Sequence, residues 1–390
     1  MKRKFKVMIG GGGTGGHLFP ALSIANEIKF RFPDADMLFI GAENRMEMER
    51  VPAAGYRVIG LPVAGFNRKN LLKNFSVVVR LIKSLRIMKK IIHDFKPDIA
   101  IGVGGYSSGP ALRMASAFHI PILIQEQNSY AGMTNKWLGK RAAKICVAYK
   151  GMDKYFPADR IVITGNPVRK ELETIRKKDA NALQYFGIEK DTPVVLVIGG
   201  SLGARTLNQS MLKDLNLLID AGVHVIWQTG RTAYHSVSEE LNGLYEHLAI
   251  QETPHVVIPE KQNVIKCRRL WISEFLVRMD YAYSVADLVV SRAGAGTLSE
   301  LSILKKAAIL VPSPNVAADH QTKNARTLSE QQAAVLIPDN VAEKQLIPTV
   351  IELLKDIERL RALSENIATF AQYNSAKRIV DEVVKIIEIQ

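Results

Sequence analysis

Cysteine is scarce in this 390-residue chain: its two cysteines, Cys146 and Cys267, lie far apart and outside any CxxC or Cys/His spacing. This scarcity excludes a disulfide framework and a structural zinc site, so both thiols are expected to be buried in a reducing compartment. Long apolar runs are also missing, because no stretch approaches the roughly 18 uncharged apolar residues that a membrane span requires. The protein is therefore expected to be soluble or bound at a membrane surface.

Acidic residues are outnumbered, since 38 Asp and Glu stand against 52 Lys and Arg and leave a net charge of +14. Such an excess favours an anionic partner, which leaves nucleic acid, an anionic membrane and a phosphorylated substrate open. The 47% hydrophobic and 23% charged fractions are those of a globular protein. At roughly 150 residues per domain, the length predicts two or three domains.

Short apolar segments, each followed by a turn and a helical pattern, recur in both halves of the chain. Fully apolar strands that alternate with helices indicate buried parallel sheets, so two doubly wound α/β domains are expected. The expected strands of the first half are Phe5–Ile9, Met37–Ile40, Ile99–Val103, Ile122–Ile124, Ile145–Ala148 and Ile161–Ile163. Those of the second half are Pro193–Ile198, His224–Trp227, His255–Ile258, Leu288–Val290, Ala308–Val311 and Ala334–Ile337.

The boundary between the two domains is expected near Gly165–Arg169, where a strand ends in turn residues and a charged segment follows. The N-terminal domain then covers residues 1–166 and the C-terminal domain residues 167–364. Residues 365–390 are expected to form a last helix that packs back towards the N-terminal domain.

Six glycines and one threonine fill Gly10–Gly16, between an expected strand and an expected helix. Such a loop lets a phosphate approach backbone N–H groups at a helix N-terminus, and a plain tight turn is the alternative. No Walker A lysine follows, which disfavours a P-loop ATPase. Glu43, at the end of the second strand, keeps an NAD-dependent dehydrogenase open. His17 closes the loop and suits proton transfer at neutral pH, unless it is a helix-cap histidine.

Polar side chains follow two further strands of the first half. The glycine cluster Gly102–Pro110 offers hydroxyl groups and open backbone, and Gln125–Asn128 places four polar side chains at the end of a buried strand. Ligands bind at this end of open parallel sheets, and four buried polar side chains need a polar ligand or a hydrogen-bond network. Glu126 is therefore a second candidate for a general base, with a structural hydrogen-bond acceptor as the alternative.

The second half carries two comparable clusters. Gly199–Arg205 is a candidate phosphate cradle, and in Ala286–Leu301 a strand ends in a turn of small residues before a new helix. There Glu300 can accept two hydrogen bonds from a ribose diol while the backbone of Ala295–Ser299 meets phosphate; a solvated helix residue is the alternative. No His or carboxylate cluster has metal-ligand spacing, so no metal site is expected.

Positive charge concentrates in Phe66–Pro97, where nine basic residues and one acidic residue give +8. The pattern predicts a basic amphipathic helix, typical of a membrane-surface element in which each cation near an anionic leaflet contributes roughly 1 kcal/mol. The alternative is a domain helix with an apolar stripe in the core and a solvated basic face. The two interpretations are compatible if the stripe lies in the core and the cations face lipid. Nucleic acid is less favoured, because Val77–Ile92 contains no aromatic residue for base stacking. A second basic segment, Lys261–Arg269, is expected to be a loop insertion.

The members of this basic helix fall into two sets. The cations expected at the membrane are Arg80, Lys83, Arg86, Lys89 and Lys90. The apolar stripe consists of Val77, Val78, Leu81, Ile82, Leu85, Met88, Ile91, Ile92 and Phe95.

These motifs, in this order, resemble the MurG family of bacterial peptidoglycan glycosyltransferases over essentially the whole chain. The matching motifs are GGTGGH at Gly12–His17, GGYSSGP at Gly104–Pro110, EQN at Glu126–Asn128, GNPVR at Gly165–Arg169, GGSxGA at Gly199–Ala204 and SRAGAGTLSE at Ser291–Glu300. The resemblance implies the GT-B fold, in which two Rossmann-like, doubly wound parallel-sheet domains face a cleft. It also implies inverting transfer of GlcNAc from UDP-GlcNAc to the 4-hydroxyl of lipid-linked MurNAc-pentapeptide, the step from lipid I to lipid II in peptidoglycan synthesis.

The resemblance further implies that the protein is peripheral on the cytoplasmic face of the bacterial inner membrane. No cofactor and no obligatory catalytic metal are expected. The expected partners are UDP-GlcNAc, undecaprenyl-pyrophosphoryl-MurNAc-pentapeptide, an anionic membrane surface and other proteins of cell-wall synthesis, but no nucleic acid.

The resemblance assigns roles to single residues as well. On the donor side, Arg169 and Ser201 would contact the diphosphate, Leu276 the uracil through its backbone, Glu300 the ribose and Gln321 the GlcNAc hydroxyls. The phosphate and ribose region would be met by Ala295, Gly296, Thr297, Leu298 and Ser299. Further substrate-binding positions are Thr14, Gly15, Gly16 and Asn128. The loops on the acceptor side contain Gly12, Gly13, Gly104, Gly105, Tyr106, Ser107 and Ser108. His17 leads as general base, with Glu126 second.

The chain departs from the family pattern in three places. Gln125 stands where the family usually has histidine, which weakens a proton-relay role there; Leu202 replaces the glutamine of GGSQGA; and the 261–269 insertion is not part of the pattern. The alternatives are another GT-B lipid glycosyltransferase, such as a diacylglycerol type, and a non-catalytic, membrane-associated protein that binds nucleotide sugars. The motifs Gly104–Pro110 and Glu126–Asn128 argue against the first, and the polar clusters at both sets of strand ends disfavour the second.

Overall fold

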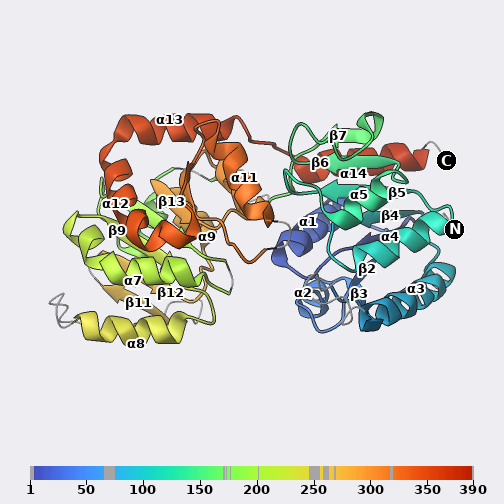
Figure 1. Ribbon diagram of the computed structural model, residues 1–390, viewed down its shortest axis with the longest axis horizontal. Coiled ribbons are helices and arrows are strands. Elements are labelled where there is room, and N and C mark those ends of the chain that lie inside the picture. Colours follow the sequence, from blue (N-terminus) through green and yellow to red (C-terminus); the bar gives the residue numbers. More distant parts are fainter. Residues whose placement is uncertain are drawn as a thin grey trace. The chain divides into compact units, whose positions relative to one another are not determined.

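The computed structural model describes residues 4–65, 75–169, 172, 174–175, 177–200, 202–245, 255–257, 263–267, 269–316 and 319–388. The chain divides into two compact units, Met1–Arg169 with Gln372–Gln390 and Lys170–Ala371 (Figure 1). The return to the first unit thus begins at Gln372, a little later than the residue 365 that the sequence suggests. Across the described ranges, no helix is both long enough and apolar enough to cross a membrane.

The first unit is built on a seven-stranded sheet in the order β3-β2-β1-β4-β5-β6-β7, with every neighbouring pair parallel. Its strands are β1 (Lys6–Gly10), β2 (Asp36–Ala42), β3 (Arg57–Leu61), β4 (Ile99–Gly102), β5 (Ile122–Glu126), β6 (Lys144–Val147) and β7 (Ile161–Ile163). Its α-helices are α1 (Gly15–Arg31), α2 (Glu47–Ala53), α3 (Phe75–Phe95), α4 (Ser108–Ala117), α5 (Met133–Gly139) and α14 (Ser375–Glu388). The edge strand β3 was not expected from the sequence, because its residues alternate between exposed and partly buried instead of forming an apolar run.

Helices cover both faces of this sheet because successive strand residues point to opposite sides. Val7 and Ile9 of β1 join one buried cluster with residues of α1 and α14, whereas Met8 joins another with residues of α3, α4 and α5. The last helix, α14, packs on α1. An ion pair of 2.6 Å between Arg31 and Asp381 links the same two helices. The C-terminal segment is therefore part of the first unit's core.

The second unit contains an eight-stranded sheet in the order β10-β11-β12-β9-β8-β13-β14-β15. Its strands are β8 (Val194–Ile198), β9 (His224–Gln228), β10 (His255–Val257), β11 (Asn263–Cys267), β12 (Leu270–Ser273), β13 (Leu288–Ser291), β14 (Ala307–Leu310) and β15 (Val335–Leu336). Its α-helices are α6 (Ala180–Phe186), α7 (Arg205–Asp220), α8 (Tyr234–Tyr245), α9 (Met279–Val285), α10 (Ala295–Ile303), α11 (His320–Ser329), α12 (Ala342–Lys355) and α13 (Ile357–Ala368).

The expectation that Lys261–Arg269 is a loop insertion is wrong for its described part. Residues 263–267 form β11, which pairs antiparallel with both β10 and β12 at the edge of an otherwise parallel sheet. Val264 and Ile265 are buried there, and Lys266 lies opposite Trp271 with its ammonium 5.4 Å from the ring centroid. The sequence did not reveal this strand because Lys266 follows the buried pair Val264 and Ile265 and interrupts the apolar run.

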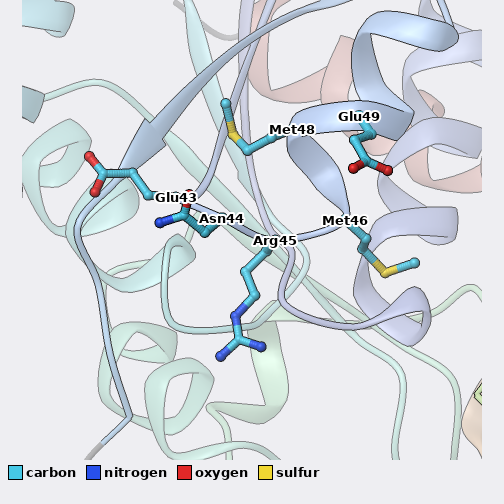
Figure 2. Close-up of a pocket in the computed structure, with 6 residues that line it drawn as sticks. All are labelled: Glu43, Asn44, Arg45, Met46, Met48 and Glu49. Atoms are coloured by element: carbon cyan, nitrogen blue, oxygen red, sulfur yellow. The ribbon is translucent and has the colours of Figure 1, made fainter.

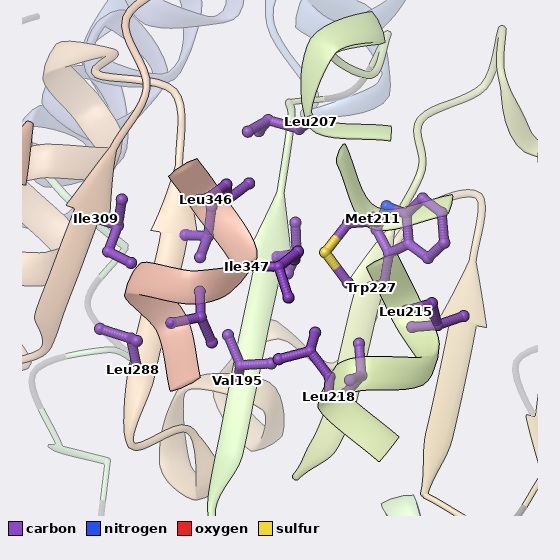
Figure 3. Close-up of a cluster of buried hydrophobic side chains, with 14 of the residues drawn as sticks. Val195, Leu207, Met211, Leu215, Leu218, Trp227, Leu288, Ile309, Leu346 and Ile347 are labelled. Carbon is purple, nitrogen blue, oxygen red and sulfur yellow. The ribbon is translucent and has the colours of Figure 1, made fainter. Parts of the chain in front are cut away.

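The core of the second unit lies between the sheet and helices α7 and α12 (Figure 3). Trp227 of β9 is completely buried there, and its indole N–H donates to Asn208 Oδ1 at 3.1 Å. The strand residues Val195, Leu288 and Ile309 meet the helix residues Met211, Leu215, Leu218, Leu346 and Ile347 in the same cluster. This packing holds the sheet in place, and the loops at the carboxyl ends of its strands contain the predicted donor-binding residues.

The strand order of each sheet reverses at one place, between β1 and β4 in the first unit and between β8 and β13 in the second. At such a switch point, the loops after the two adjoining strands diverge to opposite faces and leave room for a ligand at the carboxyl edge. The glycine-rich loops predicted from the sequence follow these four strands. The fold therefore directs attention to the carboxyl edge of each sheet.

Candidate functional site

Two glycine loops of the first unit are in backbone contact. A Cβ atom added to Gly105 would lie 2.3 Å from the carbonyl oxygen of Gly12, and one added to Gly104 would lie 2.7 Å from His17 Cδ2. Gly104 and Gly105 also have positive φ angles of 96° and 84°, which L side chains rarely adopt. Only glycine at these positions lets the loop after β4 approach the loop after β1 and the ring of His17.

His17 lies in the first turn of α1, which begins at Gly15 and is preceded by Thr14 in extended conformation. The Thr14 hydroxyl oxygen is 3.1 Å from His17 Nδ1, so the ring bonds a side chain rather than only capping the helix backbone. If Nδ1–H donates to this oxygen, Nε2 carries the lone pair that a general base needs. The geometry therefore allows the role that the sequence predicts for His17.

Glu47 is a site residue that the sequence did not reveal. Its side chain is 1% exposed, and its carboxylate accepts the N–H of Gly13 at 3.0 Å to each oxygen and the N–H of Ala42 at 2.9 Å. A Cβ atom on Gly12 would lie 2.3 Å from Glu47 Oε1. The Gly13 N–H, which we expected to be open to a phosphate, is thus already bonded. One carboxylate in an acidic segment carries no sequence signal for this contact.

A hollow of about 540 Å³ adjoins the start of α2. Its lining residues come from the loop after β2 and from α2 (Figure 2): Glu43, Asn44, Arg45, Met46, Met48 and Glu49. Glu43 is exposed here, and the carboxylate that reaches the glycine loop is instead Glu47. This arrangement disfavours the dehydrogenase alternative, in which Glu43 would bind a ribose beside that loop.

The polar residues at the end of β5 form a hydrogen-bond network. Gln125 Nε2 donates to Asn166 Oδ1 at 2.9 Å, Asn166 Nδ2 donates to the carbonyl of Gln127 at 3.0 Å, and Gln127 Nε2 donates to the carbonyl of Val103 at 2.7 Å. All three side chains are at most 3% exposed. The network ties the Glu126–Asn128 motif to the loop after β4 and to the Gly165–Arg169 motif, and Gln125 takes part in it although histidine is usual at that position.

Glu126 is 2% exposed and accepts four N–H bonds. Oε1 accepts from the backbone and side-chain nitrogens of Asn128 at 3.1 and 3.2 Å, and Oε2 accepts from Gly132 N at 3.0 Å and Asn135 Nδ2 at 2.9 Å. A carboxylate offers about four lone-pair sites, so these donors occupy its acceptor capacity. The geometry favours the structural alternative for Glu126 over the general base.

The loop residues after β4 differ in exposure. Tyr106 is 57% exposed, whereas Ser107 and Ser108 are buried. Ser108 Oγ donates to the carbonyl of Gly105 at 3.0 Å, and Ser107 Oγ has no hydrogen-bond partner among the residues that the structure describes. This loop therefore presents one exposed aromatic ring and one buried hydroxyl.

In the second unit, Gln228 links two loops of the predicted donor site and is another residue that the sequence did not single out. Its Oε1 accepts the N–H of Leu276 at 3.0 Å, and its Nε2 donates to the carbonyl of Gly200 at 3.1 Å. The predicted uracil-binding segment is thereby fixed to the loop after β8. In that loop, Leu202 is 68% exposed, and Ser201 lies outside the described residues.

Helix α10 presents its N-terminus at the end of the loop after β13. Gly294 precedes the helix in extended conformation, and no side-chain cap is formed there by the described residues. The first helical hydrogen bond runs from the Leu298 N–H to the Gly294 carbonyl at 3.0 Å. The N–H groups of Ala295, Gly296 and Thr297, which precede it, thus have the orientation that binds an anion. Ser299 lies one turn further on and donates from Oγ to the carbonyl of Ala295 at 3.0 Å.

Glu300 and Gln321 are held by neighbouring groups. The hydroxyl of the fully buried Tyr283 donates to Glu300 Oε2 at 2.9 Å, and Gln321 Oε1 accepts the N–H of Ser313 at 2.9 Å. Arg169 is exposed and is the last residue of the first unit's N-terminal segment. The same unit contains Thr14, Gly15, Gly16 and Asn128. The predicted substrate-binding positions are thus divided between the two units, and each group lies at the carboxyl edge of its own sheet.

Three large pKa shifts lie away from these loops. Burial lowers the pKa of Lys306 to about 7 and that of His224 to about 4, and both residues are at the amino ends of strands. Burial raises the pKa of the Cys146 thiol, inside β6, to about 12. Desolvation is the largest cause in each case, so these shifts reflect the cores rather than a reactive site.

Two family models match most of the chain. The glycosyltransferase family 28 N-terminal domain matches residues 7–147, and the glycosyltransferase family 28 C-terminal domain matches residues 194–379.

Curated relatives match over almost the full length. A UDP-N-acetylglucosamine--N-acetylmuramyl-(pentapeptide) pyrophosphoryl-undecaprenol N-acetylglucosamine transferase from Parabacteroides distasonis is 57% identical over 99% of both chains. A protein of the same name from Porphyromonas gingivalis is 51% identical over 99% of this chain and 96% of its own. Among solved structures, MurG from Acinetobacter baumannii has a TM-score of 0.74 and 25% identity, over 98% of this chain and 100% of that one.

Two Rossmann-like units with glycine loops at the carboxyl edges of their sheets define a glycosyltransferase of the GT-B fold. The chain belongs to glycosyltransferase family 28 and is an N-acetylglucosamine transferase by its relatives. The fold class predicted from the sequence is confirmed, and so is the resemblance to the MurG family.

The substitution Glu126→Gln distinguishes the two roles of this residue. Because an amide nitrogen would face N–H donors on one side, we expect the free energy of unfolding to fall by about 1–3 kcal/mol. The pH dependence of kcat should keep its form. Glu43→Gln, at an exposed position in the same unit, is the matched control. It should change neither the free energy of unfolding nor the pH dependence of kcat. Denaturant titration measures the stability, and a pH–rate profile measures the pH dependence. A normal stability together with loss of the acid-side limb, where kcat rises as the base deprotonates, would identify Glu126 as the base.

Proposed function

We propose that this chain transfers N-acetylglucosamine from UDP-N-acetylglucosamine to an undecaprenyl-pyrophosphoryl-linked N-acetylmuramyl-pentapeptide, as lipid I is converted to lipid II. The observation that carries the proposal is the 57% identity, over 99% of both chains, to a relative named for this reaction. The motifs Gly104–Pro110 and Glu126–Asn128, which argue against another GT-B lipid glycosyltransferase, lie at the carboxyl edge of the first unit's sheet, after β4 and β5.

The donor is proposed to bind in the second unit. The N–H groups at the start of α10 meet its phosphates, and the Glu300 carboxylate accepts hydrogen bonds from the ribose diol. With its N–H held by Gln228, Leu276 presents its carbonyl to the uracil. Gln321 is assigned to the GlcNAc hydroxyls, and Ser201 and Arg169 to the diphosphate.

The acceptor is proposed to meet the glycine loops of the first unit, around His17 and Tyr106. His17 takes the proton of the muramyl 4-hydroxyl as that oxygen attacks the anomeric carbon of GlcNAc, and the bond to UDP breaks on the opposite side. Backbone N–H groups, the α10 dipole and Arg169 stabilise the negative charge on the leaving UDP. These groups make an obligatory catalytic metal unnecessary in the proposed mechanism.

The exposed face of α3 is proposed to bind the cytoplasmic leaflet of the membrane. All five predicted cations, Arg80, Lys83, Arg86, Lys89 and Lys90, are exposed. The expected apolar stripe is divided: Val77, Met88, Ile91, Ile92 and Phe95 are buried, Leu85 is partly buried, and Val78, Leu81 and Ile82 are 36–47% exposed. Phe75 and Val79 are exposed as well, by 78% and 50%. Cations beside exposed apolar side chains are typical of an interfacial helix.

The proposed reaction is tested by UDP release from UDP-GlcNAc with and without a lipid I analogue, first without added metal and then with EDTA. We expect release only when the acceptor is present, and release that survives EDTA. Tight UDP-GlcNAc binding without release would contradict the acceptor assignment. Loss of activity in EDTA, restored by a divalent cation, would contradict the metal-independent mechanism.

Replacing His17 with alanine should lower kcat by about 10²- to 10⁴-fold, because a positioned general base contributes that much. The KM for UDP-GlcNAc should stay within a factor of two or so, since His17 does not hold the donor in this proposal. His235→Ala, at a site where the side chain is 87% exposed, is the control. Steady-state kinetics decide: equal losses in kcat and donor affinity, or no loss, would rule out the assignment.

Neutralising Lys83, Arg86, Lys89 and Lys90 to glutamine should abolish most binding to anionic vesicles, because each cation near the leaflet contributes roughly 1 kcal/mol. Sedimentation with phosphatidylglycerol vesicles measures the bound fraction. The control variant neutralises four exposed lysines of the second unit, Lys190, Lys213, Lys344 and Lys355. Equal binding by the two variants would refute a specific role for α3.

A further inference from the structure

The carboxylate of Glu300 is held by a side chain from another helix. Tyr283 lies in α9, is completely buried and places its hydroxyl 2.9 Å from Glu300 Oε2. Glu300 itself is in α10 and is partly exposed, as a residue that meets a ligand should be. The contact therefore joins a fully buried ring to a partly exposed carboxylate at the edge of the proposed donor site.

The direction of this hydrogen bond follows from the chemistry of the two groups. An ionised carboxylate only accepts, so the tyrosine O–H donates to Oε2. A carboxylate has about four lone-pair sites, and the hydrogen bond from Tyr283 takes one of them. Tyr283 thus orients the carboxylate through a single site, whereas the four donors around Glu126 take all of its sites.

The ring of Tyr283 has little freedom to move. Its helix packs on α6 and contacts β8 of the sheet, and the neighbouring residues Ala282 and Ser284 are also buried. A donor fixed in this way restricts the rotamers of Glu300 before the nucleotide arrives. Pre-organisation of a binding group strengthens binding because less conformational entropy is lost on association.

We propose that Tyr283 is a positioning residue that orients the Glu300 carboxylate for the ribose 2′- and 3′-hydroxyls of the uridine nucleotide, and so contributes to selection of a ribonucleotide donor. This inference rests on the proposed role of Glu300 in donor binding. It adds a residue outside the family's sequence motifs, with a function that operates only through Glu300.

The test compares two ligands, UDP and 2′,3′-dideoxy-UDP, by titration calorimetry with the full chain. Wild-type protein should prefer UDP, and Glu300→Ala should abolish the preference. Tyr283→Phe, which keeps the buried ring and removes only the hydroxyl, should weaken UDP binding by about tenfold and leave the dideoxy ligand unaffected. Adding Tyr283→Phe to Glu300→Ala should change neither affinity, because the hydroxyl then has no carboxylate to orient.

The matched control is Tyr281→Phe, two residues away in the same helix. The Tyr281 ring stacks under the Arg278 guanidinium at 3.3 Å, and its hydroxyl has no described contact with Glu300. This variant should keep the full preference for UDP. Unfolding temperatures of all variants are measured alongside.

The outcomes separate the two claims. If Tyr283→Phe retains the wild-type preference while Glu300→Ala loses it, the role of Tyr283 is overturned and that of Glu300 stands. If wild-type protein shows no preference, or Glu300→Ala retains it, the donor-site assignment of Glu300 itself fails. Equal weakening of both ligands by Tyr283→Phe, or failure of this variant to fold, would show that Tyr283 acts through packing and would also overturn the proposal.

Discussion

Buried acceptors at the carboxyl ends of the strands must be hydrogen-bonded, and the loops of this protein are arranged around that requirement. Glu47 and Glu126 are almost fully buried carboxylates that accept N–H groups from nearby loops, from the end of β2 and from α5. An unpaired charge in such a place would be strongly destabilising, so the loops close on these side chains. The glycine loop after β1 and the loop after β5 are positioned as a consequence.

In the second unit, neutral side chains make the hydrogen bonds that hold the corresponding loops. Gln228 bridges the loops after β8 and β12, and Tyr283 reaches Glu300 from a separate helix. Because these donors and acceptors belong to the sheet and to a buried helix, the loops are held by groups that are not themselves among the predicted substrate-binding residues.

Helix α3 shows how one sequence pattern can serve two environments. Its C-terminal half buries Met88, Ile91 and Ile92 against the sheet, whereas its N-terminal half leaves Val78 and Ile82 exposed beside the cations. Helical periodicity is the same in both halves, so the sequence could not tell core from surface. The difference depends on which side chains the other elements of the fold cover, and packing alone decided this.

The sequence by itself determined the two parallel sheets, the glycine loops, the family and most strand positions, because these depend on local apolar runs and on motifs read in order. It missed β3 and β11, in which exposed or partly buried side chains interrupt the apolar run, and also the short, fully buried β12, which directly follows the basic segment. It also missed Glu47, Gln228 and Tyr283, and it left the role of Glu126 open. These depend on contacts between residues 17 to 48 positions apart, or on four donors that converge on one carboxylate. Only the tertiary structure brings such partners together, because hydrogen-bond geometry is a property of space and not of sequence spacing.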